Sequence, residues 1–496
     1  MGLRLEARLG DTSMFKAPIR KWLCCFVLLP LISGLIGIDE TNAAQHPDLP
    51  NVLLLVADDL GYAELGCQGN ADVQTPQIDA LAKQAVRYTQ GYVTAPNCSP
   101  SRAGFLSGRF PTRFGYEFNP IGPRNEDPDT GFPRQQFTLA ELLHDTGYTT
   151  GLVGKWHLGG AADFHPQRHG FDEFFGFLHE GHYFVPSPWN NTTTWIRRKG
   201  LPPGSDGRYQ VNEHLVYSSH MGHDEPAYDA NNPVLRGGQP VIEEAYFTDA
   251  ITREATSFIR RYHDDPWFLC VAYNAVHSPL QAKNETLTKF AEEEDIQRRI
   301  FLAMLYDLDK SVGEILETLR EVKQDKNTLV MFISDNGGPT KETTASNLPL
   351  RDGKGSMYEG GIRVPFLVRW PGKLKGGTTS DAVVSSVDLY ATLTSYLGQT
   401  PKQSLDGINL LKNEPSADRT LYWRQGKRAA LRQGRWKIVA PNGYAQRDDW
   451  ELYDLAEDPG ESNNLADLPK YSERFNELIM KWQATNDEMR EPLFGR

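Results

Sequence analysis

The segment NVLLLVADD, residues 51–59, decides the fold class. Its apolar run from Val52 to Ala57 is typical of a strand buried on both faces, as in a parallel sheet. The run ends at Asp58 and Asp59, and two carboxylates at the end of a buried strand are costly unless they are paired or bind a metal. Ligand sites of open α/β sheets lie at this carboxyl edge. A helix N-cap is the alternative interpretation, but it would need only one of the two acids.

Three more apolar runs, at residues 148–154, 267–273 and 328–334, alternate with helical patterns. This alternation predicts an α/β fold with a mostly parallel central sheet sandwiched by helices. Because parallel strands end at one edge, the polar residues that follow the runs should converge with Asp58 and Asp59. These polar residues are Lys155, His157, His277, Asp335 and Asn336. Lys155 and His157 are two residues apart and would point the same way if the chain stayed extended.

The composition changes twice further along the chain. Residues 168–237 are rich in Gly, Pro, Asn, Tyr and Trp, which predicts long loops with little regular structure. Short strand patterns at 428–432, 436–439 and 450–454 predict a small antiparallel sheet, followed by a helix at about 470–487. We therefore expect a catalytic domain at 45–405 and a smaller C-terminal α+β subdomain at 406–496.

The N-terminus has the layout of a secretory signal peptide. Arg20 and Lys21 precede an apolar run at 22–38, and small residues follow at 41–44. We predict a signal peptide at 1–44, with Met14 as an alternative start, and export to the periplasm or the extracellular space. An uncleaved membrane anchor is the alternative, but the run is short for a span and contains Pro30. No other stretch is apolar enough, so no stable membrane span is expected after cleavage.

Charge and cysteine content narrow the function. The net charge of −12 over 496 residues argues against nucleic-acid binding, although local cations could still hold an anionic substrate. Two of the five cysteines fall in the leader, which leaves Cys67, Cys98 and Cys270. Three is an odd number, so the chain is not a disulfide scaffold. An unpaired thiol is a liability in an oxidising compartment, so one of the three needs another fate.

One of these cysteines lies in the turn-rich segment CSPSR, residues 98–102. Pro100 is suited to the first turn of a helix. This places Cys98 just before a helix N-terminus, where backbone N–H groups attract anions. The alternative is a buried structural cysteine beside a helix cap.

The polar residues at the strand ends, together with Arg102 and Lys354 beside them, form two sets. The first set offers hard oxygen ligands that suit Ca²⁺ or Mg²⁺ but not Zn²⁺, and comprises Asp58, Asp59, Asp335 and Asn336. The second set is basic and comprises Arg102, Lys155, His157, His277 and Lys354. One divalent ion with three fixed cations predicts a site for a doubly charged tetrahedral anion.

With these residues the chain resembles a known family, the type I sulfatases of the alkaline phosphatase superfamily, over nearly its whole mature length. Its pattern is nearest to arylsulfatases, N-acetylgalactosamine-6-sulfatase-like enzymes and bacterial polysaccharide sulfatases. The segment CSPSR matches the family signature Cys-x-Pro-Ser-Arg. The other matching segments are GKWHLG at 154–159, DNG at 335–337, Gly355 and EGGIRVP at 359–365.

The resemblance implies that a dedicated maturation enzyme oxidises Cys98 to Cα-formylglycine. One hydroxyl of the hydrated aldehyde would attack sulfur, and the ester oxygen would leave. The second hydroxyl would then lose its proton and expel sulfate as the aldehyde re-forms, an exit that a serine or cysteine nucleophile lacks.

The resemblance also implies the role of each site residue. Asp58, Asp59, Asp335 and Asn336 would bind Ca²⁺, which would also contact residue 98 and polarise the sulfate. Arg102 would orient the hydrated aldehyde, and Lys155 and Lys354 would neutralise sulfate oxygens. His157 would assist proton transfer at the hydrated aldehyde, and His277 would protonate the leaving oxygen. Glu64 stands where relatives usually carry Asp, outside this ligand set.

The expected activity is hydrolysis of sulfate esters on a carbohydrate, with a sulfated polysaccharide or oligosaccharide as substrate. The polar and aromatic residues 179–195 suit a sugar, and His182 and Arg424 are possible sugar contacts. A phosphatase or phosphonate hydrolase on the same fold is the alternative enzyme, although no second set of metal ligands is visible in the sequence. A non-catalytic anion-binding relative is the alternative outside enzymes.

Overall fold

The strand β1 (Asn51–Ala57) lies at the centre of the largest sheet and is buried along its whole length. Leu53 and Leu55 pack into the core on one face of the sheet, and Val52 and Leu54 pack into the core on the other. Alternate residues of a strand point to opposite faces, so an apolar run without alternation can be buried only between two layers. This computed structural model describes residues 49–412 and 418–495, so the predicted signal peptide lies outside the described residues.

The largest sheet has the strand order β14-β2-β13-β12-β1-β10-β3-β4-β8-β9. Its inner strands β12 (Thr328–Ser334), β1, β10 (Trp267–Ala272), β3 (Thr149–Lys155) and β4 (Glu173–Phe177) run parallel to one another. The outer pairings are mixed and involve β14 (Thr378–Ser385), β2 (Val86–Tyr92), β13 (Phe366–Arg369), β8 (Leu235–Arg236) and β9 (Gln239–Pro240). The predicted α/β fold with a parallel centre is confirmed, and the four predicted strands are β1, β3, β10 and β12.

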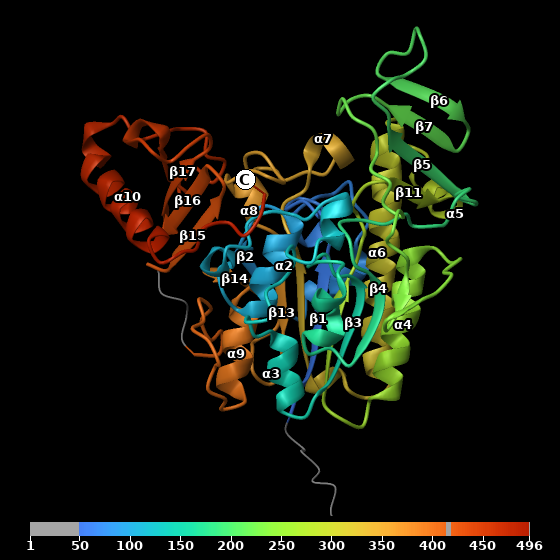
Figure 1. Cartoon of the computed structure of the whole chain (residues 1–496), viewed down its shortest axis with the longest axis horizontal. Helices are drawn as coiled ribbons and strands as arrows, with labels where there is room; N and C mark the ends of the chain where they lie inside the picture. Colours follow the sequence, from blue (N-terminus) through green and yellow to red (C-terminus); the bar gives the residue numbers. More distant parts are fainter. Residues whose placement is uncertain (1–48, 413–417, 496) are drawn as a thin grey trace, which may run out of the picture. The chain divides into compact units, whose positions relative to one another are not determined.

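Helices cover both faces of this sheet (Figure 1). The core on one face includes α1 (Pro76–Ala82), α4 (Phe247–Arg261) and α6 (Ile296–Glu321). The core on the other face includes α2 (Cys98–Ser107), α3 (Leu139–Asp145) and α9 (Asp388–Tyr396). The two cores explain why the inner strands lack alternation, because each strand face meets a layer of helices.

The prediction of long loops at 168–237 is wrong in part. Besides β4 and β8, this region contributes β5 (Thr192–Arg197), β6 (Arg208–Asn212) and β7 (Leu215–Ser218), which form a second sheet with β11 (Leu280–Lys283) in the order β11-β5-β7-β6. The sequence pattern that would predict these strands was weak, because β6 is exposed at every position and lacks an apolar face. A short helix, α5 (Asn284–Leu287), follows β11.

The C-terminal region forms an antiparallel sheet of β15 (Thr420–Gln425), β16 (Arg428–Gln433), β17 (Trp436–Ala440) and β18 (Glu451–Asp454), packed with α10 (Ser472–Asn486). Three of these strands and the helix were predicted, and β15 was missed. Two one-turn helices, α7 (Thr340–Thr343) and α8 (Glu359–Ile362), lie in the loops after β12.

Candidate functional site

The carboxyl ends of the inner strands bring the predicted residues together. Asp58 and Asp59 follow β1, Asp335 and Asn336 follow β12, and Lys155 ends β3. The backbone turns sharply after β1, since Asp59 has a φ of +62°. Asp59 N donates to Asp335 Oδ1 at 3.2 Å, which joins the ends of the two neighbouring strands.

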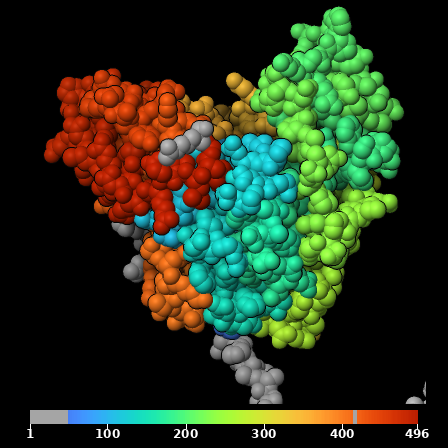
Figure 2. All heavy atoms as spheres, in the orientation of Figure 1, coloured from blue at the N-terminus to red at the C-terminus, as the bar shows by residue number. Residues whose placement is uncertain are grey.

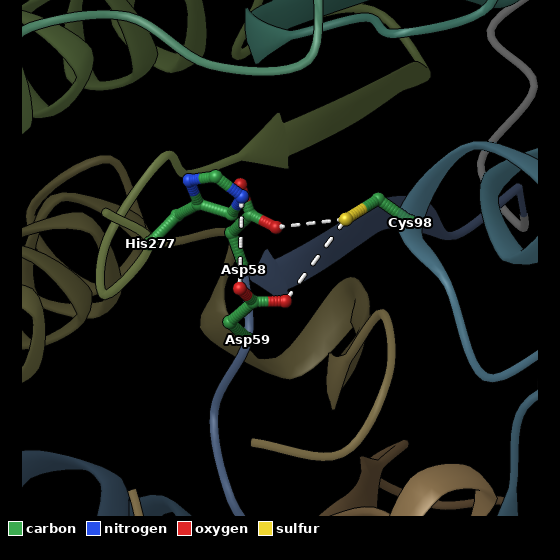
Figure 3. A group of neighbouring side chains, drawn as sticks. All are labelled: Asp58, Asp59, Cys98 and His277. Carbon is green, nitrogen blue, oxygen red and sulfur yellow. Dashed lines mark hydrogen bonds and ion pairs between the residues drawn. The ribbon is translucent and has the colours of Figure 1, made fainter. Parts of the chain in front are cut away.

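Cys98 points at the two aspartates from the opposite side (Figure 3). Its Sγ lies 3.6 Å from Asp58 Oδ1 and 4.0 Å from Asp59 Oδ1. Cys98 is the first residue of α2, so the prediction that it lies just before the helix was one residue off. The backbone N–H of Ser99 donates to Asn119 Oδ1 at 3.0 Å, which fixes the start of the helix at this edge.

Three buried carboxylates in the site each have a cationic partner. Lys155 Nζ lies 2.7 Å from Asp58 Oδ2, and Lys354 Nζ lies 2.8 Å from Asp59 Oδ2. The third pair is Arg102 with Asp335: Nε and Nη2 donate to Oδ2 at 3.0 and 2.7 Å. Arg102 Nη1 also donates to the carbonyl of Lys155 at 3.0 Å. The fixed charges therefore balance, and a divalent cation added here would leave positive charge that an anionic substrate could offset.

The donor set fits such a cation. The side-chain oxygen Oδ1 of Asn336 is buried without a hydrogen-bond partner, while its Nδ2 donates to Asp59 Oδ1 at 2.7 Å. Carboxylate and amide oxygens are ligands for Ca²⁺ and Mg²⁺. The potential ligand atoms of Asp58, Asp59, Cys98 and His277 lie within 4.8 Å of one another. His277 thus joins the cluster, whereas the Oδ2 atom of the predicted ligand Asp335 faces Arg102.

The two predicted histidines are both buried and have different partners. His157 has a φ of +54°, so the chain does not stay extended, and the condition under which Lys155 and His157 would point the same way is not met. His157 Nε2 donates to the carbonyl of Pro120 at 3.0 Å, which leaves Nδ1 buried and without a partner. His277 Nδ1 donates to the carbonyl of Ser278 at 2.5 Å, and its Nε2 lies 3.6 Å from Asp59 Oδ2.

Burial and neighbouring charges shift the titration of these groups. Burial lowers the pKa of His277 to about 3, helped by Lys354, and lowers the pKa of His157 well below its usual value, helped by Lys155. Both rings are therefore neutral at pH 7 in this state. Burial also raises the pKa of the Cys98 thiol far above its usual value, despite Lys155 and Lys354 nearby. An unmodified Cys98 would thus be a thiol with little thiolate character.

The pKa values of Asp58 and Asp59 are shifted in opposite directions. Burial raises the pKa of Asp58 to about 7, and Lys155 only partly offsets this. Burial acts on Asp59 in the same direction, but Lys354 and His277 outweigh it and lower its pKa. Burial opposes the charge of Lys354, yet Asp59 outweighs it and holds the Lys354 pKa well above the usual value.

A buried network of hydrogen bonds and ion pairs starts at Ser278, the residue after His277, and was not predicted from the sequence. The hydroxyl of Ser278 donates to Glu342 Oε1, and Arg197 Nη1 lies 2.7 Å from the same oxygen. Burial raises and Arg197 lowers the pKa of Glu342, with a net fall to about 2. Neither Arg197 nor Glu342 follows a predicted strand, so no sequence signal pointed to them.

An open pocket of about 630 Å³ lies over the site. Its lining includes Asn97, Glu342 and Lys354, which lie close to the site. It also includes Met221, which follows β7 of the second sheet, and Arg428, which begins β16 of the C-terminal sheet. Figure 2 shows the surface hollowed between the C-terminal segment in red and the segment of β6 and β7 in green. This size falls in the range of about 300–1,000 Å³ that holds small ligands.

Other predicted residues have structural partners instead. The His182 ring packs against Phe177 and Phe247, and Arg424 forms a buried ion pair with Glu117, so neither lines this pocket. Glu64 pairs with Arg298 at 2.8 Å, outside the site as expected. Cys67, Cys98 and Cys270 form no disulfide.

The central sheet between helix layers, with acidic and basic side chains gathered at the carboxyl ends of its parallel strands, defines an enzyme with an alkaline phosphatase-like α/β fold. Residues 50–399 match the Sulfatase family, and residues 352–488 match the family described as N-sulphoglucosamine sulphohydrolase, C-terminal. The chain belongs to the sulfatase family, and it is an enzyme that hydrolyses sulfuric esters.

Individual relatives agree with this assignment. The chain is 30% identical over 514 residues to an N-acetylgalactosamine-6-O-sulfatase of Bacteroides thetaiotaomicron, covering 91% of this chain and 98% of the relative. It is 34% identical over 404 residues to the human N-acetylgalactosamine-6-sulfatase, covering 78% of this chain and 70% of the relative. The crystal structure of Ps i-CgsB superimposes with a TM-score of 0.77 at 33% identity, covering 90% of this chain and 94% of that one. Among the described residues, no helix is long and apolar enough to cross a membrane.

Proposed function

We propose that this chain removes sulfate from a sulfated saccharide, with Cys98 converted to formylglycine and with bound Ca²⁺. The observation that carries the proposal is the position of Cys98. Its Sγ faces Asp58 and Asp59 next to a pocket lined by its neighbour Asn97 and by Lys354, and Lys155, Lys354 and Arg102 pair with the surrounding carboxylates.

The metal would be held by Asp58, Asp59, Asp335 and Asn336. Bound there, Ca²⁺ would supply Lewis acidity to a sulfate oxygen and lower the pKa of a hydroxyl at residue 98. The unpartnered Oδ1 of Asn336 supports this assignment, and so does the gathering of three buried carboxylates whose charges are balanced by Lys155, Lys354 and Arg102.

Formylglycine at position 98 would supply, when hydrated, one hydroxyl that attacks sulfur and a second hydroxyl whose deprotonation expels the sulfate. The position of Cys98 in the segment CSPSR, with its Sγ facing Asp58 and Asp59, supports this modification. Arg102 lies 3.7 Å from Asp58 Oδ1 and orients the groups around residue 98. Lys155 and Lys354 stabilise charge on the sulfate oxygens.

Proton transfer falls to the two histidines. The neutral Nδ1 of His157 has no partner and is available to accept a proton from residue 98. His277 donates from Nδ1 to the carbonyl of Ser278, so in the neutral ring Nε2 carries no proton. Nε2 would take up a proton when the anionic substrate binds and would then donate it to the leaving ester oxygen.

The saccharide class is supported by the relatives. Two of them are N-acetylgalactosamine 6-sulfatases, and the structure of Ps i-CgsB is also known in complex with k-i-k-neocarrahexaose, at a TM-score of 0.76. Export through the N-terminal signal, maturation by a formylglycine-generating enzyme, and domain limits at 45–405 and 406–496 belong to the same proposal.

Sulfate release from a panel of sulfated oligosaccharides tests this function, with the protein co-expressed with a formylglycine-generating enzyme. A phosphate monoester is included because a phosphatase is the alternative enzyme. We expect sulfate release that disappears in Cys98→Ala. Sulfatase activity that survives in Cys98→Ala, or faster turnover of the phosphate ester, would contradict the proposal.

A further inference from the structure

Arg428, the first residue of β16, is a half-buried arginine without an acidic partner. Its Nη1 donates to the carbonyl of Gly355 and its Nη2 donates to Gln425 Oε1 at 2.6 Å, both neutral acceptors. Two other arginines of the same region behave differently, since Arg419 pairs with Asp388 and Arg424 pairs with Glu117. Within residues 49–412 and 418–495, no carboxylate forms an ion pair with Arg428. A cation that is partly removed from water without a counter-charge favours an anionic ligand.

The position of Arg428 links it to the reacting group. Gly355 follows Lys354, and its N–H donates to the carbonyl of Pro96 at 2.8 Å, two residues before Cys98. A Cβ on Gly355 would lie 3.7 Å from Asn97 Oδ1 and 3.9 Å from Arg428 Nη1. Thus one glycine separates the guanidinium group of Arg428 from the segment that carries Cys98, and the same loop carries Lys354.

Charges around the pocket leave a second cation unpaired. Lys354 pairs with Asp59, and Glu342 pairs with Arg197. Lys341, at the rim in α7, is exposed and forms no ion pair with any described residue. Asp352 also lines the pocket, and its carboxylate accepts a hydrogen bond from the Ser356 hydroxyl at 3.1 Å. Arg428 and Lys341 therefore give the outer pocket two cations against one carboxylate.

We propose that Arg428, assisted by Lys341, binds a second anionic group of the substrate while the scissile sulfate lies at residue 98. The substrate is then a saccharide with at least two anionic groups, and the second is a sulfate or a carboxylate on the same or the adjacent sugar. The guanidinium group can donate two parallel hydrogen bonds to either group. This inference rests on the proposed function, because it assigns the outer part of the same pocket.

The test compares Arg428→Gln with the wild type on saccharides that differ only in the second group. The substrates are a monosulfated sugar, its disulfated analogue and a monosulfated disaccharide that contains a uronic acid. We expect kcat/KM for the preferred doubly anionic substrate to fall about 10- to 100-fold more than kcat/KM for the monosulfated sugar, mainly through KM. Whether the disulfated or the uronate substrate responds more strongly identifies the second group.

Lys427→Gln is the matched control, because Lys427 is exposed, adjacent in sequence and absent from the pocket lining. An equal loss on singly and doubly anionic substrates would overturn the inference, since Arg428 would then only position the Lys354 loop through Gly355. No loss in Arg428→Gln would overturn it as well.

A binding measurement separates this inference from the proposed chemistry. In the Cys98→Ala background, calorimetry with the disulfated and uronate saccharides should show weaker binding when Arg428→Gln is added. If sulfate release fails in the wild type but this weakening is seen, the chemistry is refuted and the anion site stands. If sulfate release succeeds and neither saccharide binds more weakly, the anion site is refuted and the chemistry stands.

Discussion

Replacing Lys437 with Met should destabilise the protein, because this lysine balances two buried carboxylates behind the site. Lys437 Nζ lies 2.9 Å from Glu359 Oε1 and 2.8 Å from Glu461 Oε1, and all three side chains are excluded from solvent. Glu359 begins α8, and the carbonyl of Gly361 in α8 accepts from Gly337 N at 3.0 Å, directly after Asn336. The ion cluster therefore supports the loop that follows the proposed metal ligands.

The magnitude follows from the burial of the two acids. Removing one partner of a buried ion pair costs about 3–5 kcal/mol of unfolding free energy, since it leaves an uncompensated charge. Burial, opposed by Lys437 and reinforced by Glu359, raises the pKa of Glu461 from 4.5 to about 7. The folded protein thus binds this proton more tightly than the unfolded chain, so the contribution of Glu461 to stability is largest below pH 4.5 and falls as the pH rises through 7. In Lys437→Met, the lost cation raises the pKa of Glu461 further, and the destabilisation should be larger at pH 8 than at pH 5.

Urea unfolding at pH 5 and pH 8, followed by tryptophan fluorescence, measures this effect. Lys427→Met is the control for loss of an exposed lysine and should change stability by less than about 0.5 kcal/mol. The double variant Lys437→Met with Glu461→Gln should recover much of the loss at pH 8, because it removes one charge of each sign. A loss below about 1 kcal/mol in Lys437→Met, or an equal loss at both pH values, would refute the reasoning.

Three further predictions concern the site and its surroundings. Lys354→Gln should lower kcat/KM for an aryl sulfate by about 10²–10³, because it removes a positive charge from the sulfate site; turnover within a few-fold of wild type would exclude that role. Dialysis against a chelator should abolish activity and lower the unfolding temperature, and Ca²⁺ should restore both, with about 2.7 kcal/mol of stabilisation at a concentration 100 times its Kd; an unchanged unfolding temperature would argue against a resident metal. Arg424→Ala should lower unfolding stability by about 3–5 kcal/mol without changing KM, because Arg424 pairs with buried Glu117; a raised KM at unchanged stability would restore it as a sugar contact.

The sequence predicted the elements that carry the chemistry. Four apolar runs without alternation could only be inner strands between two layers, and the polar residues after them had to meet at one edge. The pairing of Lys155 with Asp58 follows from that geometry, whereas Arg102 reaches Asp335 from helix α2. The prediction of a cation at Asp58 and Asp59 needed only their residue type and their place at a buried strand end, and it stays a prediction.

The rest depended on contacts between distant parts of the chain. The strands β6 and β7 are short and lack a strong apolar pattern, so their pairing was not visible in the sequence. The left-handed backbone at His157 turned its side chain toward Pro120, which residue spacing alone did not predict. Glu342 and Arg428 line the pocket from regions without a recognisable motif, and Arg197 pairs with Glu342 behind it. Their roles depend on which ion pairs they form, and residue spacing alone did not predict those pairs.

The mass of residue 98 tests the central claim most directly. Digestion with trypsin gives the peptide of residues 88–102, which contains Cys98, and mass spectrometry reads its side chain. In protein that releases sulfate, we predict a peptide in which an aldehyde replaces the CH₂SH group, with loss of H₂S and gain of one oxygen. An unmodified thiol at Cys98 in fully active protein would contradict the account.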